Sequence, residues 1–169
     1  MPENVELKAR FPDHRRAGEI LDSIGASYEG TERQVDTYFR ASRGRLKIRE
    51  IRGEPAELIF YERIESGERR DCTYFLHRFD DPENLRLLLE AGLGSWARVE
   101  KTRKVYRYQN VKINLDDVKG LGRFIEFEAA AEGDPESADR IVKELVEKFE
   151  IAPGQVVLES YSDLLGGRP

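Results

Sequence analysis

Hydrophobic and polar residues alternate along most of this chain, and a two-residue period is typical of β-strands. In "NVELKAR" (4–10), the apolar residues fall on one phase, while Glu6, Lys8 and Arg10 fall on the other. The alternation predicts strands over residues 4–10, 32–40, 45–52, 57–64, 70–79, 96–108, 110–118, 122–131 and 155–161. Most links between these segments are short, which favours antiparallel pairing because parallel strands need longer crossovers.

Three segments have the apolar spacing of amphipathic helices, and each begins after an aspartate that can cap the first turn. The first follows Asp13 and ends at Gly25, the second follows Asp81 and ends at Gly92, and the third follows Asp134. Their apolar stripes are Ala17, Ile20, Leu21 and Ile24 in the first, Leu85, Leu88 and Leu89 in the second, and Ile141, Val142, Leu145 and Phe149 in the third. We expect all three stripes to pack in the core.

Like charges recur at the two-residue spacing on several predicted strands, so they lie on one face about 7 Å apart. The pairs are Lys47 with Arg49, Lys101 with Arg103, and Glu126 with Glu128. A solvated outer face tolerates such pairs because water and salt screen them. If the sheet closes on itself with helices outside, the same faces instead line a lumen. Such a lumen would suit a polyphosphate held by Lys and Arg, with a divalent metal held by Glu.

Composition narrows the function classes. The chain has 169 residues, of which 36% are charged, and its net charge of −5 argues against general nucleic-acid binding. No apolar run approaches the roughly 20 residues that span a bilayer, and the N-terminus lacks the apolar core of a signal peptide. The single cysteine, Cys72, excludes an intrachain disulfide and a multi-cysteine metal site. We therefore expect a cytoplasmic protein without a nucleic-acid or membrane partner.

Seven segments in order resemble the CYTH, or triphosphate tunnel metalloenzyme, superfamily, which includes class IV adenylyl cyclases, thiamine triphosphatases and inorganic triphosphatases. The first is an N-terminal Glu-x-Glu-x-Lys strand, whose pattern falls on Asn4, Glu6 and Lys8. The others are "QVDTYF" (34–39), "RLKIRE" (45–50), "LIFYER" (58–63), "EKTRKVY" (100–106), "INLDDVKGLGRFIEFE" (113–128) and "ESYSDLL" (159–165). The resemblance implies one CYTH-like domain over residues 1–169. Its fold would be α+β, a closed eight-stranded antiparallel β-barrel forming a tunnel, with helices packed outside.

The resemblance also implies a triphosphate ligand bound with Mg²⁺ or Mn²⁺. The positions that match metal ligands are Glu6, Glu126 and Glu128, and those that match the basic shell around the phosphates are Lys8, Lys47, Arg49, Arg63, Lys101 and Arg103. Glu6 and Lys8 are the candidate catalytic residues. The departure is Asn4, which stands where the family has its first Glu. Asparagine offers a neutral carbonyl but removes one negative charge, so we expect weaker metal binding.

The expected activity is hydrolysis of an inorganic, thiamine or nucleoside triphosphate. Cyclisation of ATP to cyclic AMP and pyrophosphate is the main alternative, and a non-catalytic polyphosphate-binding module, motivated by Asn4, is another. Two aspartates stay open: Asp36 has a structural role or contacts substrate, and Asp116 forms a lumen hydrogen bond or shapes a turn. Cys72 is interpreted as a packing residue. Residues 71–79, "DCTYFLHRF", are a candidate edge for a homodimer.

Overall fold

The computed structural model describes residues 3–66 and 69–166. Eight antiparallel strands close into a barrel in the order β1-β5-β4-β3-β2-β6-β7-β8, and β8 pairs back with β1. The strands are β1 (Glu3–Arg10), β2 (Ser27–Phe39), β3 (Arg45–Ile51), β4 (Ala56–Ser66), β5 (Arg69–Phe79), β6 (Ser95–Tyr108), β7 (Val111–Val118) and β8 (Gly122–Ala130). The helices are α1 (His14–Ser23), α2 (Pro82–Leu93), α3 (Pro135–Lys148) and α4 (Tyr161–Gly166). The predicted α+β fold with a closed eight-stranded barrel is confirmed.

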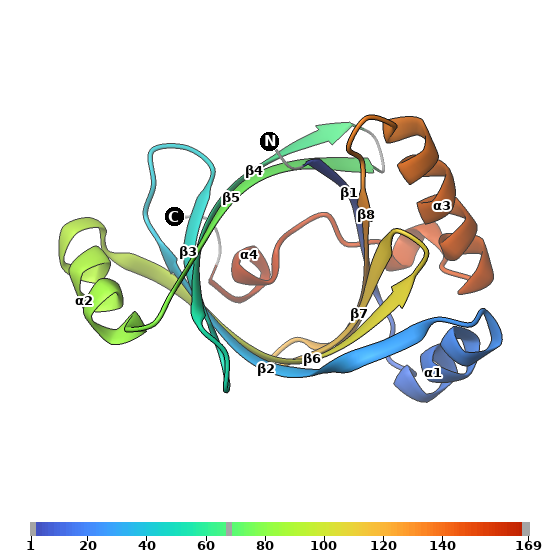
Figure 1. Ribbon diagram of the computed structural model, residues 1–169, viewed down its shortest axis with the longest axis horizontal. Coiled ribbons are helices and arrows are strands. Elements are labelled where there is room, and N and C mark those ends of the chain that lie inside the picture. The colour runs from blue at the N-terminus through green and yellow to red at the C-terminus, as the bar shows by residue number, and fades with distance from the viewer. Residues whose placement is uncertain (1–2, 67–68, 167–169) are drawn as a thin grey trace.

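The helices lie on different sides of the barrel. Seen down its axis, the barrel is a ring with α1 and α3 on one side, α2 on the opposite side, and α4 lying over the opening (Figure 1). Helix α3 packs on β1 and β8, α2 contacts β2 and β3, and α4 contacts β6. Within the described residues, none of the helices has the length and apolar character needed to cross a membrane.

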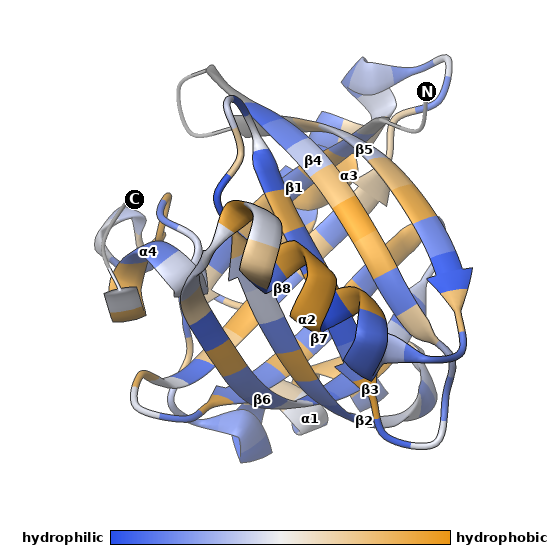
Figure 2. Cartoon of the chain, turned by 90° about the vertical axis from the view of Figure 1, so that its left-hand side faces the viewer, coloured by the Kyte–Doolittle hydropathy of each residue, from blue (hydrophilic) through white to orange (hydrophobic). Residues whose placement is uncertain are grey.

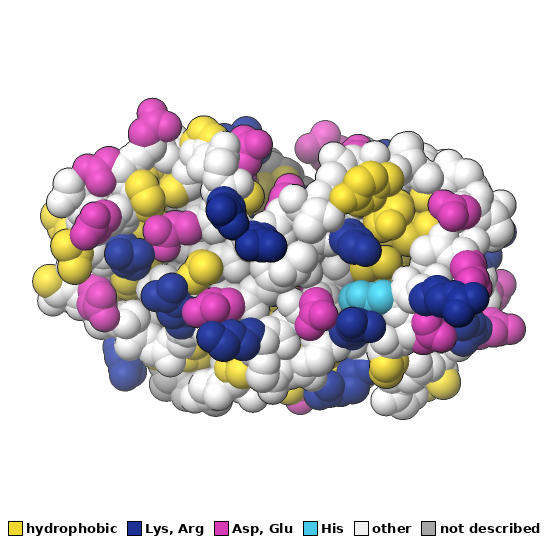
Figure 3. Space-filling view, turned by 90° about the horizontal axis from the view of Figure 1, so that it is seen from below, with side chains coloured by type: hydrophobic (Ala, Val, Ile, Leu, Met, Phe, Trp, Pro, Cys, Tyr) yellow, Lys and Arg dark blue, Asp and Glu magenta, His cyan; other side chains and the backbone are white. Residues whose placement is uncertain are grey.

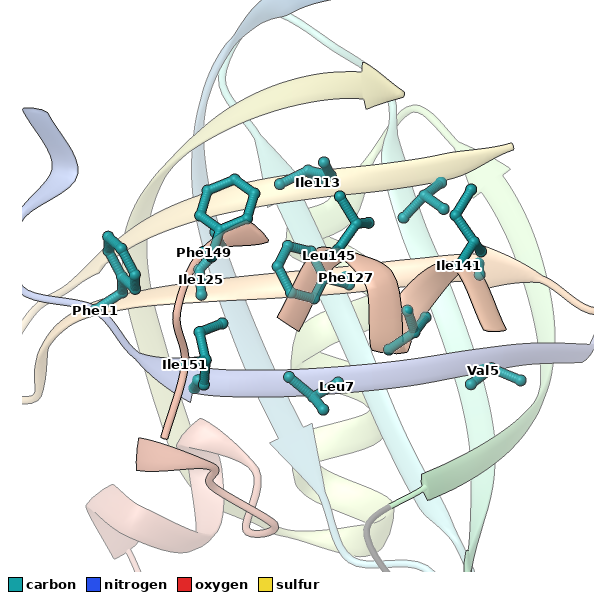
Figure 4. Packing of buried hydrophobic residues seen from close by; sticks show 14 of the residues in the cluster. Val5, Leu7, Phe11, Ile113, Ile125, Phe127, Ile141, Leu145, Phe149 and Ile151 are labelled. Carbon is teal, nitrogen blue, oxygen red and sulfur yellow. The ribbon is translucent and has the colours of Figure 1, made fainter. Parts of the chain in front are cut away.

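The main hydrophobic core lies outside the barrel wall. Hydrophobic and hydrophilic residues form alternating bands along the strands (Figure 2), and the apolar outer faces of β1, β7 and β8 lie beneath α1 and α3. Figure 4 shows Leu7, Ile113 and Phe127 of the wall packed with Leu145 and Phe149 of the α3 region. Because this core takes one face of each strand, the polar face of the same strand is directed into the barrel.

All three predicted helices begin directly after the predicted aspartate, but the Asp81 side chain makes no capping hydrogen bond. Asp13 accepts a hydrogen bond from the Arg16 backbone N–H at 3.0 Å, and Asp134 accepts one from Ser137 at 3.0 Å. Each carboxylate therefore satisfies a backbone N–H of the first helical turn that has no partner within the helix. The predicted end of α2 at Gly92 is wrong, since the helix continues to Leu93 and is capped at Gly94 with φ 78°.

The predicted core stripe of α2 is wrong. No residue of this helix is buried, and the Leu88 side chain is 67% exposed. Its neighbour Leu87 is also exposed, so apolar residues are spread over more than one face of the helix. One side of α2 rests on the barrel beside β2 and β3, and the other side faces solvent.

The predicted strand over residues 155–161 is also wrong. This segment makes only one isolated bridge, between Val156 and Ala9, and then a backbone hydrogen bond from Val157 to the Lys8 carbonyl at 2.9 Å. Beyond that point the chain turns into α4, which begins at Tyr161. The turn forms because the Ser160 hydroxyl accepts a hydrogen bond from the Asp163 backbone N–H, so the chain cannot continue along the edge of β1.

A second hydrophobic cluster lies inside the wall, at the end of the barrel where α4 sits. It consists of buried residues from six strands and the C-terminal segment: Tyr38, Ile59, Tyr61, Cys72, Val99, Val118, Phe124, Val157 and Tyr161. Tyr161 packs edge-on against Phe124 with ring centroids 4.9 Å apart. This inner cluster narrows the lumen, so the charged residues occupy the part of the barrel that it leaves open.

Candidate functional site

A cavity of about 420 Å³ occupies the lumen of the barrel. All nine residues predicted for the site line it: Glu6, Lys8, Lys47, Arg49, Arg63, Lys101, Arg103, Glu126 and Glu128. A larger groove of about 960 Å³ runs along β2, β6 and the β3–β4 turn, but Lys101 alone of the nine lines it. The charged groups converge in the lumen, which is therefore the candidate site.

Strand register explains how the residues of β1 and β8 come together. Glu6 is paired directly with Glu128, and Lys8 with Glu126, in the antiparallel β1–β8 ladder. Directly opposed residues share a face of the sheet, with Cβ atoms about 4.5–5.5 Å apart. The charges of "NVELKAR" at Glu6 and Lys8 thus face into the barrel rather than toward solvent.

Three cations of the lumen gather around one carboxylate. Asp36 is 1% exposed and lies opposite Arg49 in the β2–β3 ladder. Arg49 donates two hydrogen bonds to it at 2.8 and 2.9 Å, Lys47 donates one at 2.8 Å, and Lys101 lies 3.4 Å away. Burial would raise the pKa of Asp36, but Arg49, Lys101 and Lys47 lower it well below its usual range. Asp36 is therefore charged, and the cations of the cluster outnumber it.

Around Arg103 the arrangement is reversed, with one cation surrounded by several acidic side chains. Its guanidinium donates to both oxygens of the fully buried Asp116 at 2.7 Å, and lies 3.7 Å from Glu126 and 4.0 Å from Glu128. The Tyr161 hydroxyl donates to the same Asp116 at 2.7 Å. One cation therefore meets three acidic groups, so the lumen has a basic region around Asp36 and an acidic region around Arg103.

The carboxylates on β8 are strongly coupled. Burial raises the pKa of Glu128, and its hydrogen bond with Glu126 and the charge of Glu126 raise it further, to about 8. Burial would also raise the pKa of Glu126, but the hydrogen bond with Glu128 and the charge of Arg103 bring it well below its usual range. The pair thus shares one proton at neutral pH, with Glu126 ionised and Glu128 protonated.

The donor chemistry of this region fits a hard divalent cation, which the resemblance implies. Carboxylate oxygens come from Glu6, Glu126 and Glu128, and the buried Asn114, which donates to Glu128 at 3.3 Å, keeps its Oδ1 without a hydrogen-bond partner among the described residues. Such oxygens are the preferred ligands of Mg²⁺ and Mn²⁺. In the structure Glu6 is paired with Arg63 at 3.2 Å, and no three acidic, His or Cys side chains of the described residues converge on one point.

Asn4 and Cys72 face each other at the lumen surface. They are direct partners in the β1–β5 ladder, and both line the cavity with Glu6. Cys72, interpreted from the sequence as packing, is buried in the inner cluster and is also a wall residue of the cavity. Burial raises the pKa of the Cys72 thiol to about 12, and the nearby Glu6 charge adds to the rise, so the thiol is protonated.

Lys8 is held by the C-terminal segment. Its ammonium donates to the Glu159 carbonyl and lies 4.4 Å from the centre of the Tyr161 ring. The ammonium of Lys101 lies 5.4 Å from the same ring. Tyr161 therefore contacts two predicted phosphate-binding lysines and, through its hydroxyl, the acidic region, which brings the end of the chain into the candidate site.

Lys101 differs from the other cations. Burial lowers the pKa of its ammonium to about 7, and the positive charges of Arg49, Arg103 and Lys47 lower it while Asp36 raises it. Its side chain is 3% exposed and its 3.4 Å contact with Asp36 is the longest in the cluster. Lys101 therefore changes charge near neutral pH, while guanidinium groups beside it stay charged.

Sequence reasoning left the roles of Asp36 and Asp116 open and did not single out Tyr161 or Asn114. Asp116 forms the lumen hydrogen bonds that were one of its two alternatives, with Arg103 as the donor. Asp36 and Asp116 lie on the inward phase of β2 and β7, opposite Arg49 and Arg103 respectively. The two-residue period could have found that phase, but the opposition depends on strand register. Arg45 is not among the nine predicted residues. It pairs with Asp163 at 2.7 Å, and its guanidinium lies 5.1 Å from the centre of the Trp96 ring.

The face of the molecule seen in Figure 3 does not show such segregation. On the face seen in Figure 3, acidic and basic side chains are interspersed, with apolar groups between them. Many of these charges form exposed pairs, such as Arg123 with Asp117 at 3.3 Å. Exposed pairs are screened and contribute little to stability. The separation of charge in the lumen distinguishes it from this face of the molecule.

Comparison with known proteins identifies the family. The CYTH domain matches residues 2–158. A putative adenylate cyclase of Methanocaldococcus jannaschii is 25% identical over 175 residues, which cover 96% of this chain and 98% of that protein. The structure of the PH1012 protein of Pyrococcus horikoshii OT3 superposes with a TM-score of 0.87 at 23% identity, over 96% of this chain and 99% of the other.

A plant protein shares the fold. The putative adenylyl cyclase HpAC1 of Hippeastrum, described as having a dominant triphosphatase activity, matches with a TM-score of 0.68 at 16% identity, over 97% of this chain and 93% of its own. The tunnel barrel, the inward charges and the match over nearly the whole length agree, and the chain belongs to the CYTH domain family.

Proposed function

We propose that this protein is a divalent-metal-dependent enzyme that hydrolyses a triphosphate bound in its lumen. The observation that carries the proposal is the division of the lumen into a basic and an acidic region. Lys47, Arg49 and Lys101 gather on one side, and Glu126 and Glu128 lie on the other. A triphosphate with its metal needs this combination, since the phosphates seek cations and the metal seeks carboxylates.

The chain's own residues would divide the work as follows. Lys47, Arg49 and Lys101 bind non-bridging oxygens, and Arg63 and Arg103 stabilise the charge that develops as the phosphoryl group transfers. Lys8 and Glu6, the proposed catalytic residues, lie on the shared strand β1 beside the acidic region. Glu6, Glu126 and Glu128 would hold Mg²⁺ or Mn²⁺, which when bound neutralises phosphate charge and orients the attacking water.

The comparisons support a triphosphate ligand. Triphosphate tunnel enzymes of the CYTH family generally depend on a divalent metal and bind substrates such as ATP. Among the described residues, the Phe, Tyr and Trp side chains that line the lumen cavity are all tyrosines, namely Tyr38, Tyr61, Tyr74 and Tyr161. A wall rich in charged side chains favours recognition of the phosphates.

The test is an assay of end products. Purified protein is incubated with tripolyphosphate, thiamine triphosphate or ATP, each with Mg²⁺ or Mn²⁺, and with EDTA as the control. We expect metal-dependent release of orthophosphate, and the relative rates rank the substrates. Cyclic AMP and pyrophosphate from ATP would overturn hydrolysis in favour of a class IV adenylyl cyclase, the alternative favoured by the name of the Methanocaldococcus jannaschii relative.

A non-catalytic polyphosphate-binding module is a second alternative. The observation that favours it is Asn4, since the wall lacks a carboxylate at that position while the basic cluster around Asp36 is complete. Absence of any product, with a triphosphate still raising the melting temperature, would establish this function. Absence of both product and melting shift would overturn triphosphate binding altogether.

A further inference from the structure

The carboxylate of Asp36 stands behind the basic region rather than in it. Its side chain is 1% exposed, and it does not line the lumen cavity, whereas Lys47, Arg49 and Lys101 all do. The three cations come from two strands on either side of β2, with β3 supplying two and β6 one. Asp36 lies on β2 between those strands, so it is the group that all three share.

Each of the three cations uses only some of its hydrogen-bond donors on Asp36. Arg49 uses its Nε and one terminal nitrogen on Asp36, at 2.8 and 2.9 Å. A guanidinium has five N–H groups, so the remaining three are available to another acceptor. Lys47 and Lys101 both approach the Oδ2 atom, and an ammonium has three N–H groups. Each cation is thus held by part of its donors while the rest stay available to the cavity that it lines.

We propose that Asp36 is the positioning residue of the anion site, which fixes Lys47, Arg49 and Lys101 from behind so that they present donors to successive phosphoryl groups. This inference rests on the proposed function, because it concerns the same lumen. A ligand with several linked phosphates matches three cations held at fixed separations better than a single phosphate does. Preorganised donors bind without the cost of ordering flexible side chains.

Net charge alone predicts that replacing Asp36 strengthens anion binding, whereas a positioning role predicts that it weakens binding. The substitution therefore distinguishes the two explanations. Replacing Asp36 with asparagine removes one negative charge beside the site, and simple electrostatics then favours tighter anion binding. In the lumen, however, Lys101 faces Lys47, Arg49 and Arg103 as well as Asp36. Without Asp36 those like charges favour the neutral amine of Lys101. The three cations then lose the group that orients them, and the site gains little net positive charge.

The experiment compares Asp36→Asn with Asp163→Asn. Asp163 is a matched control, since it is a poorly exposed aspartate paired with Arg45 at 2.7 Å, and its replacement changes the net charge equally. Binding of tripolyphosphate in EDTA is measured by melting shift and titration calorimetry, and steady-state kinetics give KM and kcat with metal. We expect Asp36→Asn to weaken binding and raise KM about tenfold or more, with a larger loss at pH 6, where Lys101 of the unmodified protein is charged, than at pH 8. Asp163→Asn should leave these values unchanged.

A second variant guards against loss of folding. Asp36→Glu keeps the charge but lengthens the side chain by one methylene, so the carboxylate no longer holds the three cations at the same separations. We expect it to weaken tripolyphosphate binding more than orthophosphate binding. Equal or tighter tripolyphosphate binding in Asp36→Asn or Asp36→Glu would overturn the positioning role. If the unmodified protein neither binds nor turns over a triphosphate, the proposed function itself fails. Normal binding and turnover in the unmodified protein, with both Asp36 variants matching Asp163→Asn, would reject only the role of Asp36.

Discussion

Glu6 and Glu128 lie directly opposite each other across the β1–β8 ladder, and both line the lumen. Glu6 is paired with Arg63 at 3.2 Å, while Glu128 shares a proton with Glu126. Two carboxylates at such a separation repel when both are ionised. Here a guanidinium neutralises one and a proton neutralises the other.

Replacing Glu126 with Gln should abolish metal-dependent turnover with little loss of folding. Glutamine has nearly the shape of glutamate, but it lacks the charge and cannot share a proton with Glu128. Metal titration by calorimetry and a melting curve in EDTA measure the two effects separately. Glu144→Gln, on the exposed side of α3 and paired with Lys148 at 3.6 Å, is the control. Unchanged metal-dependent turnover in Glu126→Gln would contradict the metal assignment.

Replacing Asn4 with Glu should strengthen metal binding, by about tenfold, because it adds a carboxylate to a wall that already has Glu6. The new side chain would lie opposite Cys72, whose protonated thiol adds no charge. Calorimetric titration with Mn²⁺ gives the change in affinity, and the product assay tells whether turnover rises with it. Asn4→Gln, which lengthens the side chain without a charge, should not produce the gain; an equal gain in that variant would refute the charge argument.

Binding of a triphosphate should weaken as pH rises from 6 to 8.5, because Lys101 has a pKa of about 7. Its charge is present below that pKa and is lost above it, and a bound anion shifts the loss to higher pH by favouring the ammonium. Arginine keeps its charge throughout this range. The pH dependence of tripolyphosphate affinity in EDTA should therefore be flatter in Lys101→Arg than in the unmodified protein, and parallel curves would show that another group is responsible.

Tyr161 should contribute to the stability of the fold. Tyr161→Phe removes the hydrogen bond to Asp116 but leaves the ring against Phe124, and we expect a loss of about 1 kcal/mol in the free energy of unfolding. Tyr161→Ala removes the ring as well, and the loss should be about 3–5 kcal/mol. Urea unfolding measures the free energy of unfolding of each variant. Tyr28→Phe, at a 56% exposed tyrosine, should be nearly neutral, and an effect equal to that of Tyr161→Phe would contradict this account.

The two-residue period was sufficient to predict the faces of the strands. It placed Lys47 with Arg49 and Glu126 with Glu128 on common faces, and all four line the lumen. Alternation does not determine which face is inside, because both faces of a barrel wall satisfy it equally well. The resemblance to the CYTH superfamily predicted that the sheet closes into a barrel, and a closed barrel with helices outside directs the charged faces inward.

Other features depend on contacts between distant residues. Asp36 lies opposite Arg49 because of the β2–β3 register, which a pattern within one strand does not contain. The apolar spacing of α2 predicted a core helix, but Leu88 is exposed because the barrel beneath the helix buries only part of one side. Residues 155–161 have strand-like alternation, yet Tyr161 begins a helix that packs at the end of the lumen.

The pairing of β1 with β8 has a consequence for the order of folding. Lys8 pairs with Glu126 in this ladder and also contacts Glu159, which lies 151 residues further along the chain, so the entropy of closing a long loop must be overcome before such contacts form. Hairpins such as β4–β5 and β7–β8 can form from adjacent segments, whereas the seam between β1 and β8 joins distant ones. We expect this seam to close late. Glu6 and Lys8 then meet Glu128 and Glu126 only as folding is completed, and a ligand bound to residues on both sides of the seam would slow its reopening.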